Sequence, residues 1–286
     1  MKNPSFVFFG TPHIAVTVLE EMKTFGIMPS LVVCNPNAPT GRKQIITPPP
    51  VKVWAEENSI PVFQPASLKD RAQLKELTET SWDFFVVMAY GKILPEWLLE
   101  IPKYKTINAH PSLLPKMRGA SPVRSALLTD MDAIGVTIMR VDKELDHGPI
   151  LLQQAVSLNG TPIPGNELDE TLGRISGCLL VEAMQKLPTG EIAEKEQDHE
   201  QATFCTKITK EMGEIKIDPH NLPHGSEALS LYAKICAFDG WPGTFFFYNN
   251  KRIKIVTAEI RNDTLTIQRV IPEGKKEIDF DTFLKQ

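Results

Sequence analysis

The segment INAHPSLLPKMRGASP, residues 107–122, places an asparagine and a histidine two residues apart at the end of a short apolar run. In a β-strand, residues i and i+2 point to the same side, so Asn108 and His110 are expected to project together. An amide can donate a hydrogen bond to a developing oxyanion, and an imidazole can move protons near neutral pH. Taken alone, the pair fits two polar residues that satisfy a loop better than it fits a catalytic pair.

A carboxylate that could act on this imidazole lies in the segment MRVDKELDHGPIL, residues 139–151. Asp146 falls in a turn between two predicted strands, and a carboxylate beside an imidazole orients the ring and stabilises its protonated form. Asp142 and Glu144 are near enough in the sequence to compete for this role, so spacing alone does not choose Asp146. His147 is interpreted as a loop residue and not as a second base.

The elements that must position these side chains alternate along the first half of the chain. Apolar runs predict strands, and apolar residues at helical spacing predict helices, the last of them capped by Ser67 with Asp70 three residues on. This alternation of strands and helices predicts a parallel sheet with right-handed crossovers, in which ligands bind beyond the carboxyl ends of the strands. The predicted strands are 5–10, 29–34, 60–65 and 83–90, and the predicted helices are 13–26, 50–59 and 67–79.

The second half begins in the same style and then changes. Residues 135–142 and 148–158 predict strands, and residues 166–187 predict a long amphipathic helix. Beyond a polar stretch, residues 240–260 predict two strands joined by a YNNK turn, and residues 264–271 predict a third. We therefore expect a catalytic domain at 1–190, a linker at 191–203 and a small β-rich domain at 204–286.

Composition narrows the class of protein. The chain has 286 residues with 42% hydrophobic and 23% charged residues and a net charge of −4, which is ordinary for a globular protein and argues against a uniformly basic nucleic-acid binder. Its four cysteines show no CxxC and no metal-ligand spacing, which favours reduced thiols. No signal peptide and no run of 18 apolar residues is evident, so we expect a cytoplasmic protein.

Several of these segments together resemble one known family. FFGTPHIAVTVLEEM, APTGRKQIITPPPVKVWAEENSIPVFQP, VVMAYGKILPEWLL, the segments around Asn108 and Asp146, and the final PEGKKEIDFDTFLKQ are similar to formyltransferases that use 10-formyltetrahydrofolate. The resemblance covers almost the whole chain. Its loop at residues 38–57 is most similar to the members that formylate methionyl-tRNA.

The resemblance implies roles for the matching positions. Asn108, His110 and Asp146 match the catalytic asparagine, histidine and aspartate of the family. The folate-binding positions would be Ser112, Leu113, Leu114 and Pro115, together with Ala89, Tyr90 and Gly91. The positions near the acceptor substrate would be Gly10 and Thr11, with Arg42 and Lys43 at the tRNA acceptor end.

The implied reaction transfers the formyl group of 10-formyltetrahydrofolate to the α-amine of methionyl-initiator tRNA. The resemblance implies a Rossmann-like first domain and an OB-like second domain. We expect the second domain to be abbreviated, because only residues 261–272 lie between the strand that ends at Ile260 and the closing EGKK. The resemblance also implies a monomer that needs no metal. His147, where relatives often carry a small hydroxyl residue, is expected to shift the pH response of the site.

Three alternatives stay open. The same three residues would serve a formyltransferase that acts on a sugar-nucleotide or another small amine, or a hydrolase that releases formate from the folate. A non-catalytic protein that holds a nucleotide or folate is a different class, and it would not need all three residues. A dinucleotide-dependent dehydrogenase is disfavoured because the chain has no GxGxxG motif.

Overall fold

The computed structural model describes residues 3–41 and 43–285, and the chain divides into two compact units. The first unit comprises Met1–Ala120, Gly135–Val156 and Glu170–Phe204, and the second comprises Ser121–Ile134, Ser157–Asp169 and Cys205–Gln286. Each unit has its own sheet and its own apolar core.

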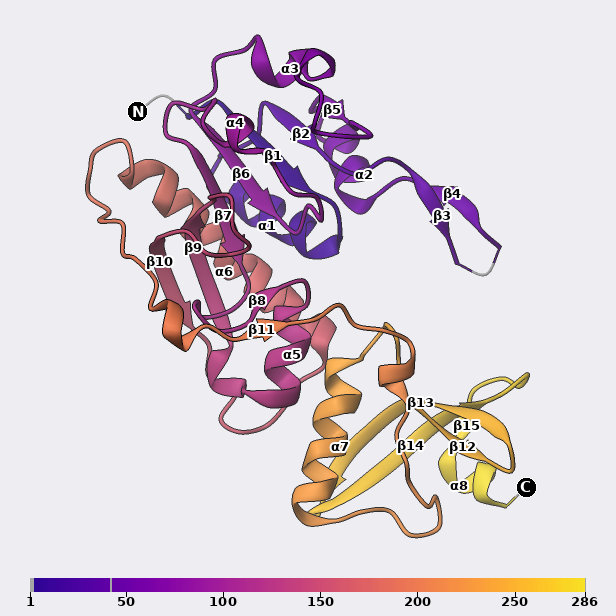
Figure 1. The fold of residues 1–286 in the computed structure, drawn as a ribbon. Coiled ribbons are helices and arrows are strands. Elements are labelled where there is room, and N and C mark those ends of the chain that lie inside the picture. The colour runs from indigo at the N-terminus through magenta and orange to yellow at the C-terminus, as the bar shows by residue number, and fades with distance from the viewer. Residues whose placement is uncertain (1–2, 42, 286) are drawn as a thin grey trace. The chain divides into compact units, whose positions relative to one another are not determined.

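A seven-stranded sheet forms the centre of the first unit, in the order β10-β9-β7-β6-β1-β2-β5 (Figure 1). Five of its strands are parallel, and β9 and β10 add an antiparallel pairing at the β7 edge. The predicted doubly wound, mostly parallel sheet is confirmed. The strands are β1 Phe6–Gly10, β2 Leu31–Val33, β5 Val62–Phe63, β6 Phe84–Met88, β7 Thr106–His110, β9 Gly135–Arg140 and β10 Ile150–Ala155.

Helices cover both faces of this sheet. On one face α1 (His13–Thr24) packs beside α2 (Pro50–Glu57) and against α6 (Gly165–Lys186), where a Cβ on Gly173 would lie 2.8 Å from Thr17. On the other face, residues of α3 (Lys75–Thr78) and α4 (Glu96–Leu99) share one core with Val7 and Phe9 of β1. Because the strands are buried on both faces, their sequences are continuous apolar runs.

The single helix predicted for residues 67–79 is wrong. The segment forms a short 3₁₀ turn, η1 (Arg71–Gln73), which Asp70 caps by accepting a hydrogen bond from the Ala72 N–H at 3.0 Å, and then the one-turn helix α3. Leu68, Leu74 and Leu77 all enter the same core. On one continuous helix Leu68 would lie about 120° around the axis from Leu74, so one helix cannot bury all three.

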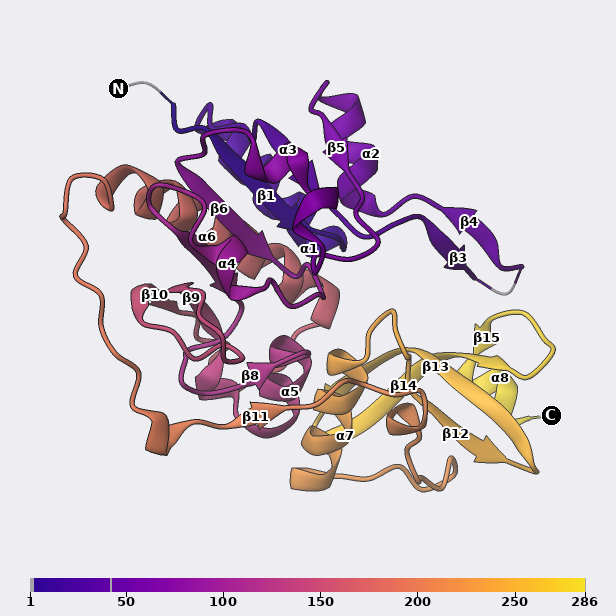
Figure 2. The same ribbon diagram turned by 45° about the horizontal axis from the view of Figure 1, so that its top comes forward.

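Residues 38–47, for which no strand was predicted, form a β-hairpin. β3 (Ala38–Thr40) pairs antiparallel with β4 (Ile45–Thr47), and all six residues are exposed. In two views of the ribbon the hairpin extends away from the helices and sheet of its own unit (Figures 1 and 2).

The second unit is built on a four-stranded antiparallel sheet in the linear order β12-β13-β14-β15. The YNNK turn is confirmed: Asn249 and Asn250 both have positive φ, 49° and 59°, as a two-residue hairpin turn requires. Helix α7, which the sequence analysis missed, packs on β13, on β14 and on α5. The elements are β12 Phe245–Tyr248, β13 Lys251–Arg261, β14 Thr264–Pro272, β15 Ile278–Asp279, α5 Pro122–Thr129, α7 Gly225–Ala237, α8 Phe280–Leu284, η2 Met131–Ala133 and η4 Glu211–Gly213.

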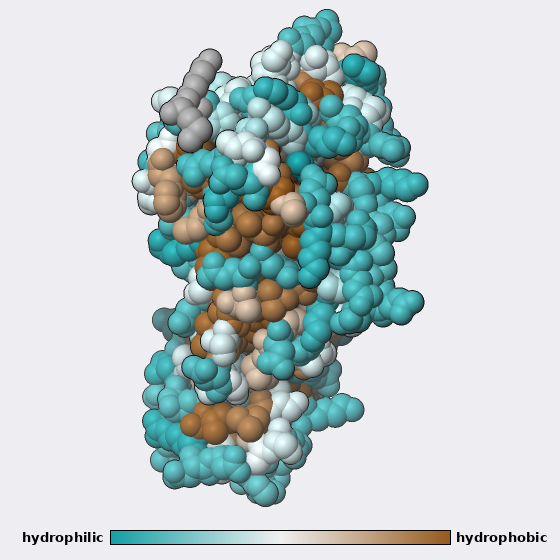
Figure 3. Space-filling view, turned by 90° about the vertical axis from the view of Figure 1, so that its left-hand side faces the viewer, coloured by the Kyte–Doolittle hydropathy of each residue, from teal (hydrophilic) through white to brown (hydrophobic). Residues whose placement is uncertain are grey.

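Residues 195–204, which we name the strap, fall almost entirely in the segment predicted to be a linker. The strap starts at a β-bridge between Lys195 and Ile150 of β10, passes through η3 (His199–Gln201) and reaches β11 (Phe204–Cys205), which pairs with β8 (Arg118–Gly119). Seen from the left-hand side of Figure 1, hydrophobic residues gather along the middle of the surface and hydrophilic residues flank them (Figure 3). No helix among the described residues is both long and apolar enough to span a membrane.

Candidate active site

Asn108 and His110 lie at the carboxyl end of β7, in the middle of the sheet. Asn108 is in register with Val87 of β6 and Met139 of β9, and the two-residue spacing puts both side chains on one side of the strand. His110 is 5% exposed, whereas Asn108 is half-buried. Among the described residues no hydrogen bond occupies the Asn108 amide. The strand end therefore presents a held imidazole beside an available amide.

Two groups face the imidazole of His110. Its Nε2 lies 2.9 Å from the carbonyl oxygen of Met117, and because a carbonyl only accepts, Nε2 must carry the proton of this hydrogen bond. Its Nδ1 lies 3.7 Å from Oδ1 of Asp146, which is an ion-pair distance but too long for a hydrogen bond. Nδ1 is therefore the ring atom at which His110 can gain or lose a proton.

Asp146 is fixed at one oxygen and turned to His110 with the other. Its Oδ2 accepts a hydrogen bond from the Gly119 N–H at 2.8 Å, and its own backbone has the left-handed φ of 50°. Asp142, one of the two competitors that the sequence left open, instead accepts a hydrogen bond from Nδ1 of His147 at 2.7 Å. The third carboxylate, on Glu144, is exposed, so the structure selects Asp146 as the partner of His110.

The four residues expected to contact folate differ in what they expose. Ser112 is fully buried and its hydroxyl donates to the Lys116 carbonyl at 2.7 Å, and Leu114 is 3% exposed with both backbone groups bonded. Leu113 and Pro115 are half-buried. Ser112 and Leu114 therefore hold the loop in shape, and Leu113 and Pro115 are the pair with accessible apolar surface.

The other expected folate-binding residues, Ala89 to Gly91, lie beside the turn that follows β1. Tyr90 points its side chain into the core, where its ring packs edge-on against Phe9 at 5.5 Å, and its carbonyl accepts a hydrogen bond from Thr11 Oγ1 at 3.2 Å. Ala89 and Gly91 are exposed. Gly10 is buried, and a Cβ there would lie 2.6 Å from the ring of Phe8. The structure thus brings Thr11 and residues 89–91 together at the carboxyl ends of β1 and β6.

The two basic residues expected to approach tRNA fall in the β3–β4 hairpin. Lys43 lies in the turn between the two strands and is exposed. Arg42 lies outside the described residues.

Comparison with known proteins assigns the chain to a family. A family model described as formyl transferase matches residues 4–163, and one described as formyl transferase, C-terminal domain, matches residues 207–266. The methionyl-tRNA formyltransferase of Halalkalibacterium halodurans is 39% identical over 253 residues, which are 88% of this chain and 77% of that protein. The one from Thermotoga neapolitana is 41% identical, over 88% of this chain and 78% of that protein. The chain belongs to the methionyl-tRNA formyltransferase family.

A solved structure of another formyltransferase has the same fold. It is the N-formyltransferase from Helicobacter canadensis in complex with folinic acid and dTDP-3-aminofucose, with a TM-score of 0.63 over 93% of this chain and 99% of that chain. At 17% sequence identity the match shows a shared architecture only.

Three residues that contact the candidate site were missed by the sequence analysis. Met117 holds His110 through its carbonyl, a contact that no side-chain pattern reveals. Asn35, which directly follows the apolar run of β2, donates from its amide to the Tyr90 carbonyl at 2.9 Å and to Thr11 at 3.2 Å. Its position at a strand end was the available signal. Gln197 of the strap donates to the Asp146 carbonyl at 3.0 Å, and nothing in its charged segment indicated that contact.

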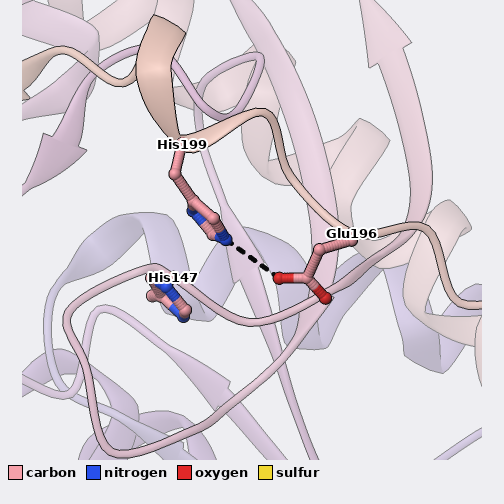
Figure 4. Close-up of side chains that lie close together, drawn as sticks. All are labelled: His147, Glu196 and His199. Carbon is pink, nitrogen blue, oxygen red and sulfur yellow. Dashed lines mark hydrogen bonds and ion pairs between the residues drawn. The ribbon is translucent and has the colours of Figure 1, made fainter.

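His147, His199 and Glu196 lie close together, as the ligands of a metal ion would (Figure 4). Ligand atoms of His147, Glu196 and His199 lie within 4.8 Å of one another. The two rings are stacked with centroids 4.0 Å apart and an angle of 2° between their planes. A metal ion lies close to the plane of each imidazole that binds it, and two parallel, separated planes share no such point, so one ring would have to rotate first.

The tautomer of His199 also opposes metal binding. Nη2 of Arg118 lies 2.8 Å from Nδ1 of His199 and can only donate, so Nδ1 accepts and Nε2 carries the ring proton of the neutral form. Nε2 lies 2.9 Å from Glu196 Oε1, to which it donates. The arrangement is therefore a hydrogen-bonded stack and not a preformed metal site.

Proposed function

We propose that this chain transfers the formyl group of 10-formyltetrahydrofolate to the α-amine of methionyl-initiator tRNA. The observation that carries the proposal is the meeting of Asn108, His110 and Asp146 at the carboxyl end of β7 in a chain 39% and 41% identical to two methionyl-tRNA formyltransferases. A strand end in the middle of a mostly parallel sheet is where such folds bind their ligands.

The reaction forms a bond between the amine nitrogen and the formyl carbon and breaks the bond from that carbon to N10 of the folate. Only the neutral amine is a nucleophile, and its attack produces a tetrahedral oxyanion. The amide of Asn108, free of other partners among the described residues, supplies a donor to that oxygen. The formyl group on N10 is already activated, so the proposed chemistry calls for no metal.

His110 and Asp146 manage the proton that leaves the amine and must reach N10. The Nε2–H bond to the Met117 carbonyl holds the ring in one orientation, so the proton is exchanged at Nδ1. Oδ1 of Asp146, 3.7 Å away, stabilises the imidazolium that forms. The carboxylate thus supports the charged form of His110, while the carbonyl sets its geometry.

The other expected residues take supporting roles in this proposal. Folate would lie along Leu113, Pro115 and the exposed backbone of residues 89–91, while the acceptor amine would enter past Thr11. The exposed β3–β4 hairpin would bring Lys43 and Arg42 to the phosphates of the tRNA acceptor end. The functional division into 1–190, 191–203 and 204–286, a monomeric state and a cytoplasmic location belong to the same proposal.

The test is formyl transfer from 10-formyltetrahydrofolate, run in parallel with methionyl-initiator tRNA, free methionine and a dTDP-aminosugar, with His110→Ala as the control. Formyl-methionyl-tRNA made by the parent and not by His110→Ala is the expected result. Transfer to the aminosugar, or release of formate without tRNA product, would keep the formyl chemistry and overturn the acceptor.

A further inference from the structure

Gln197 of the strap is a buried amide in contact with the loop that carries Asp146. It is 4% exposed, and its Nε2 donates to two carbonyl oxygens of that loop, at 3.0 Å to Asp146 and at 2.7 Å to Gly148. Its Oε1 accepts two hydrogen bonds from Arg118, from Nε at 3.2 Å and from Nη2 at 2.7 Å. Both amide protons and the amide oxygen are therefore fully used.

The orientation of this amide is fixed by the chemistry of its neighbours. A guanidinium only donates and a carbonyl only accepts, so a reversed amide would face Arg118 with protons and two carbonyls with its oxygen. Arg118 is itself 4% exposed, and its backbone N–H donates to the Thr203 carbonyl of the strap at 2.9 Å. Hydrogen bonds from a charged guanidinium are stronger than those between neutral groups.

These contacts close a ring around Asp146. Gln197 holds its backbone, the Asp146 carboxylate accepts from the Gly119 N–H at 2.8 Å, and Gly119 follows Arg118, which returns to Gln197. Asp146 has a φ of 50°, a left-handed conformation that is less favourable for a residue with a side chain than for glycine and gains from the support of its surroundings. The ring supplies that support from both the main chain and the side chain.

The strap also contacts the peptide that orients His110, the partner of Asp146. Thr203 Oγ1 accepts a hydrogen bond from the Met117 N–H at 2.9 Å, and the Met117 carbonyl is the group that orients His110. One segment of chain therefore contacts both the turn that carries Asp146 and the peptide that holds His110.

We propose that Gln197 is a positioning residue that fixes Oδ1 of Asp146 beside Nδ1 of His110. The proposal rests on the proposed function for its kinetic consequence, since it concerns the same site. Gln197 does not touch the reacting atoms. It acts through Asp146, by setting the backbone from which that carboxylate projects.

The test compares Gln197→Met with Gln201→Met, both in the parent and in an Asp146→Asn background. Gln201 is the matched control because it lies in the same strap, is exposed and donates only within its own turn, to Asp198 at 2.6 Å. A second variant, Gln197→Glu, removes the donors to the two carbonyls but keeps an acceptor for Arg118, whose guanidinium balances the added carboxylate charge, so it guards against a fold lost through an unpaired arginine. Thermal unfolding and binding of folinic acid are measured for every variant.

Both Gln197 variants are expected to lower kcat about 10- to 100-fold, the effect of a misplaced catalytic group, with KM nearly unchanged. In the Asp146→Asn background the same substitutions are expected to change kcat less than about threefold, since no carboxylate is left to position. Equal losses in the two backgrounds, or no loss in the parent, would overturn the proposal.

A second readout does not depend on activity. In protein with ¹³C-labelled aspartate carboxyls and ¹⁵N-labelled histidine rings, the Asp146 and His110 signals are expected to move in Gln197→Met and to stay in place in Gln201→Met. Asp146 and His110 signals that do not move in Gln197→Met would contradict the proposal. If the parent fails to formylate methionyl-tRNA, the proposed function falls while these spectra still decide the role of Gln197.

Discussion

Nδ1 of His110 lies 3.7 Å from Oδ1 of Asp146, while Nε2 of the same ring is already committed to the Met117 carbonyl at 2.9 Å. The Met117 carbonyl therefore sets the orientation of the ring, and Asp146 contributes its negative charge more than it aligns the ring. This division of labour separates two effects that a single carboxylate often combines.

Replacement of Asp146 by asparagine should thus leave the His110 ring in place and remove the charge beside Nδ1. We expect kcat to fall about 10²- to 10⁴-fold, the range for loss of general acid–base catalysis, with folinic acid binding nearly unchanged. Single-turnover formyl transfer on Asp146→Asn, His110→Ala and the double variant measures this. The double variant should be scarcely slower than either single one, and fully multiplicative losses would show that the two residues act separately.

Asn108 should act on the transition state and not on substrate binding. Removal of one donor to an oxyanion typically raises the barrier by about 2.7–4 kcal/mol, so Asn108→Ala is expected to lower kcat about 10²- to 10³-fold. KM for both substrates should change little, because the tetrahedral oxygen exists only during reaction. A large rise in the KM for folate with kcat preserved would instead make Asn108 a folate-binding residue.

Gly148 is required by the close approach of the Asp146 loop to β9. A Cβ on Gly148 would lie 2.3 Å from the Arg140 carbonyl oxygen, so Gly148→Ala must displace the loop that carries Asp146. We expect a loss of about 1–3 kcal/mol in the free energy of unfolding, as for overpacked cores, together with reduced kcat. The control is Gly160→Ala, where the added Cβ would meet nothing within 4 Å and only the positive φ of 75° is strained. Equal activity in the two variants would contradict the prediction.

The sheet and the placement of Asn108 and His110 could be predicted because their signals are local. Buried parallel strands have continuous apolar sequences, and the strand period of two determines which side chains project to the same side. The prediction of a single helix at 67–79 was wrong because Leu68 and Leu74 enter one core from different directions. This tertiary packing outweighs the helical propensity of the segment.

The contacts that refine the site could not be predicted from spacing. Gln197 is separated by 51 residues from Asp146 and by 79 from Arg118, and it lies in a charged stretch whose composition is typical of a linker. Met117 contacts His110 through its backbone carbonyl, a group that every residue has, so the residue type gives no signal of the contact. Long-range backbone contacts of this kind become visible only once the strap is seen to pair with β8 and to bridge β10.

His147 adjoins Asp146 in sequence, which predicted an influence on the pH response. In the structure its ring bonds Asp142 at 2.7 Å and stacks on His199, so its contacts lie away from the Asp146 carboxylate. We now expect His147→Thr to leave the pH dependence of kcat superimposable on that of the parent while lowering thermal stability slightly. A displaced pH profile, measured from pH 5.5 to 9 with saturating substrates, would restore the original expectation.

Tyr90 provides a prediction about stability and its dependence on pH. Its hydroxyl is buried with no hydrogen-bond partner among the described residues, and burial raises the pKa of Tyr90 to about 12. Tyr90→Phe removes an unpaired polar group, so at pH 7.5 the free energy of unfolding should rise by about 1 kcal/mol.

The effect of Tyr90 on stability at alkaline pH follows from its raised pKa. The folded phenol keeps its proton while the unfolded one ionises near pH 10, so ionisation of Tyr90 in the unfolded chain leaves the free energy of unfolding unchanged below about pH 10 and lowers it between about pH 10 and 12. Burial raises the pKa of Cys34 to about 11 and adds a similar loss from about pH 9 upward, which Tyr90→Phe leaves untouched. Urea unfolding followed by the tryptophans of the first unit, in a Trp241→Phe background, should show a flatter decline for Tyr90→Phe above pH 10. Parallel curves, or a variant less stable at pH 7.5, would mean that the hydroxyl is satisfied in solution.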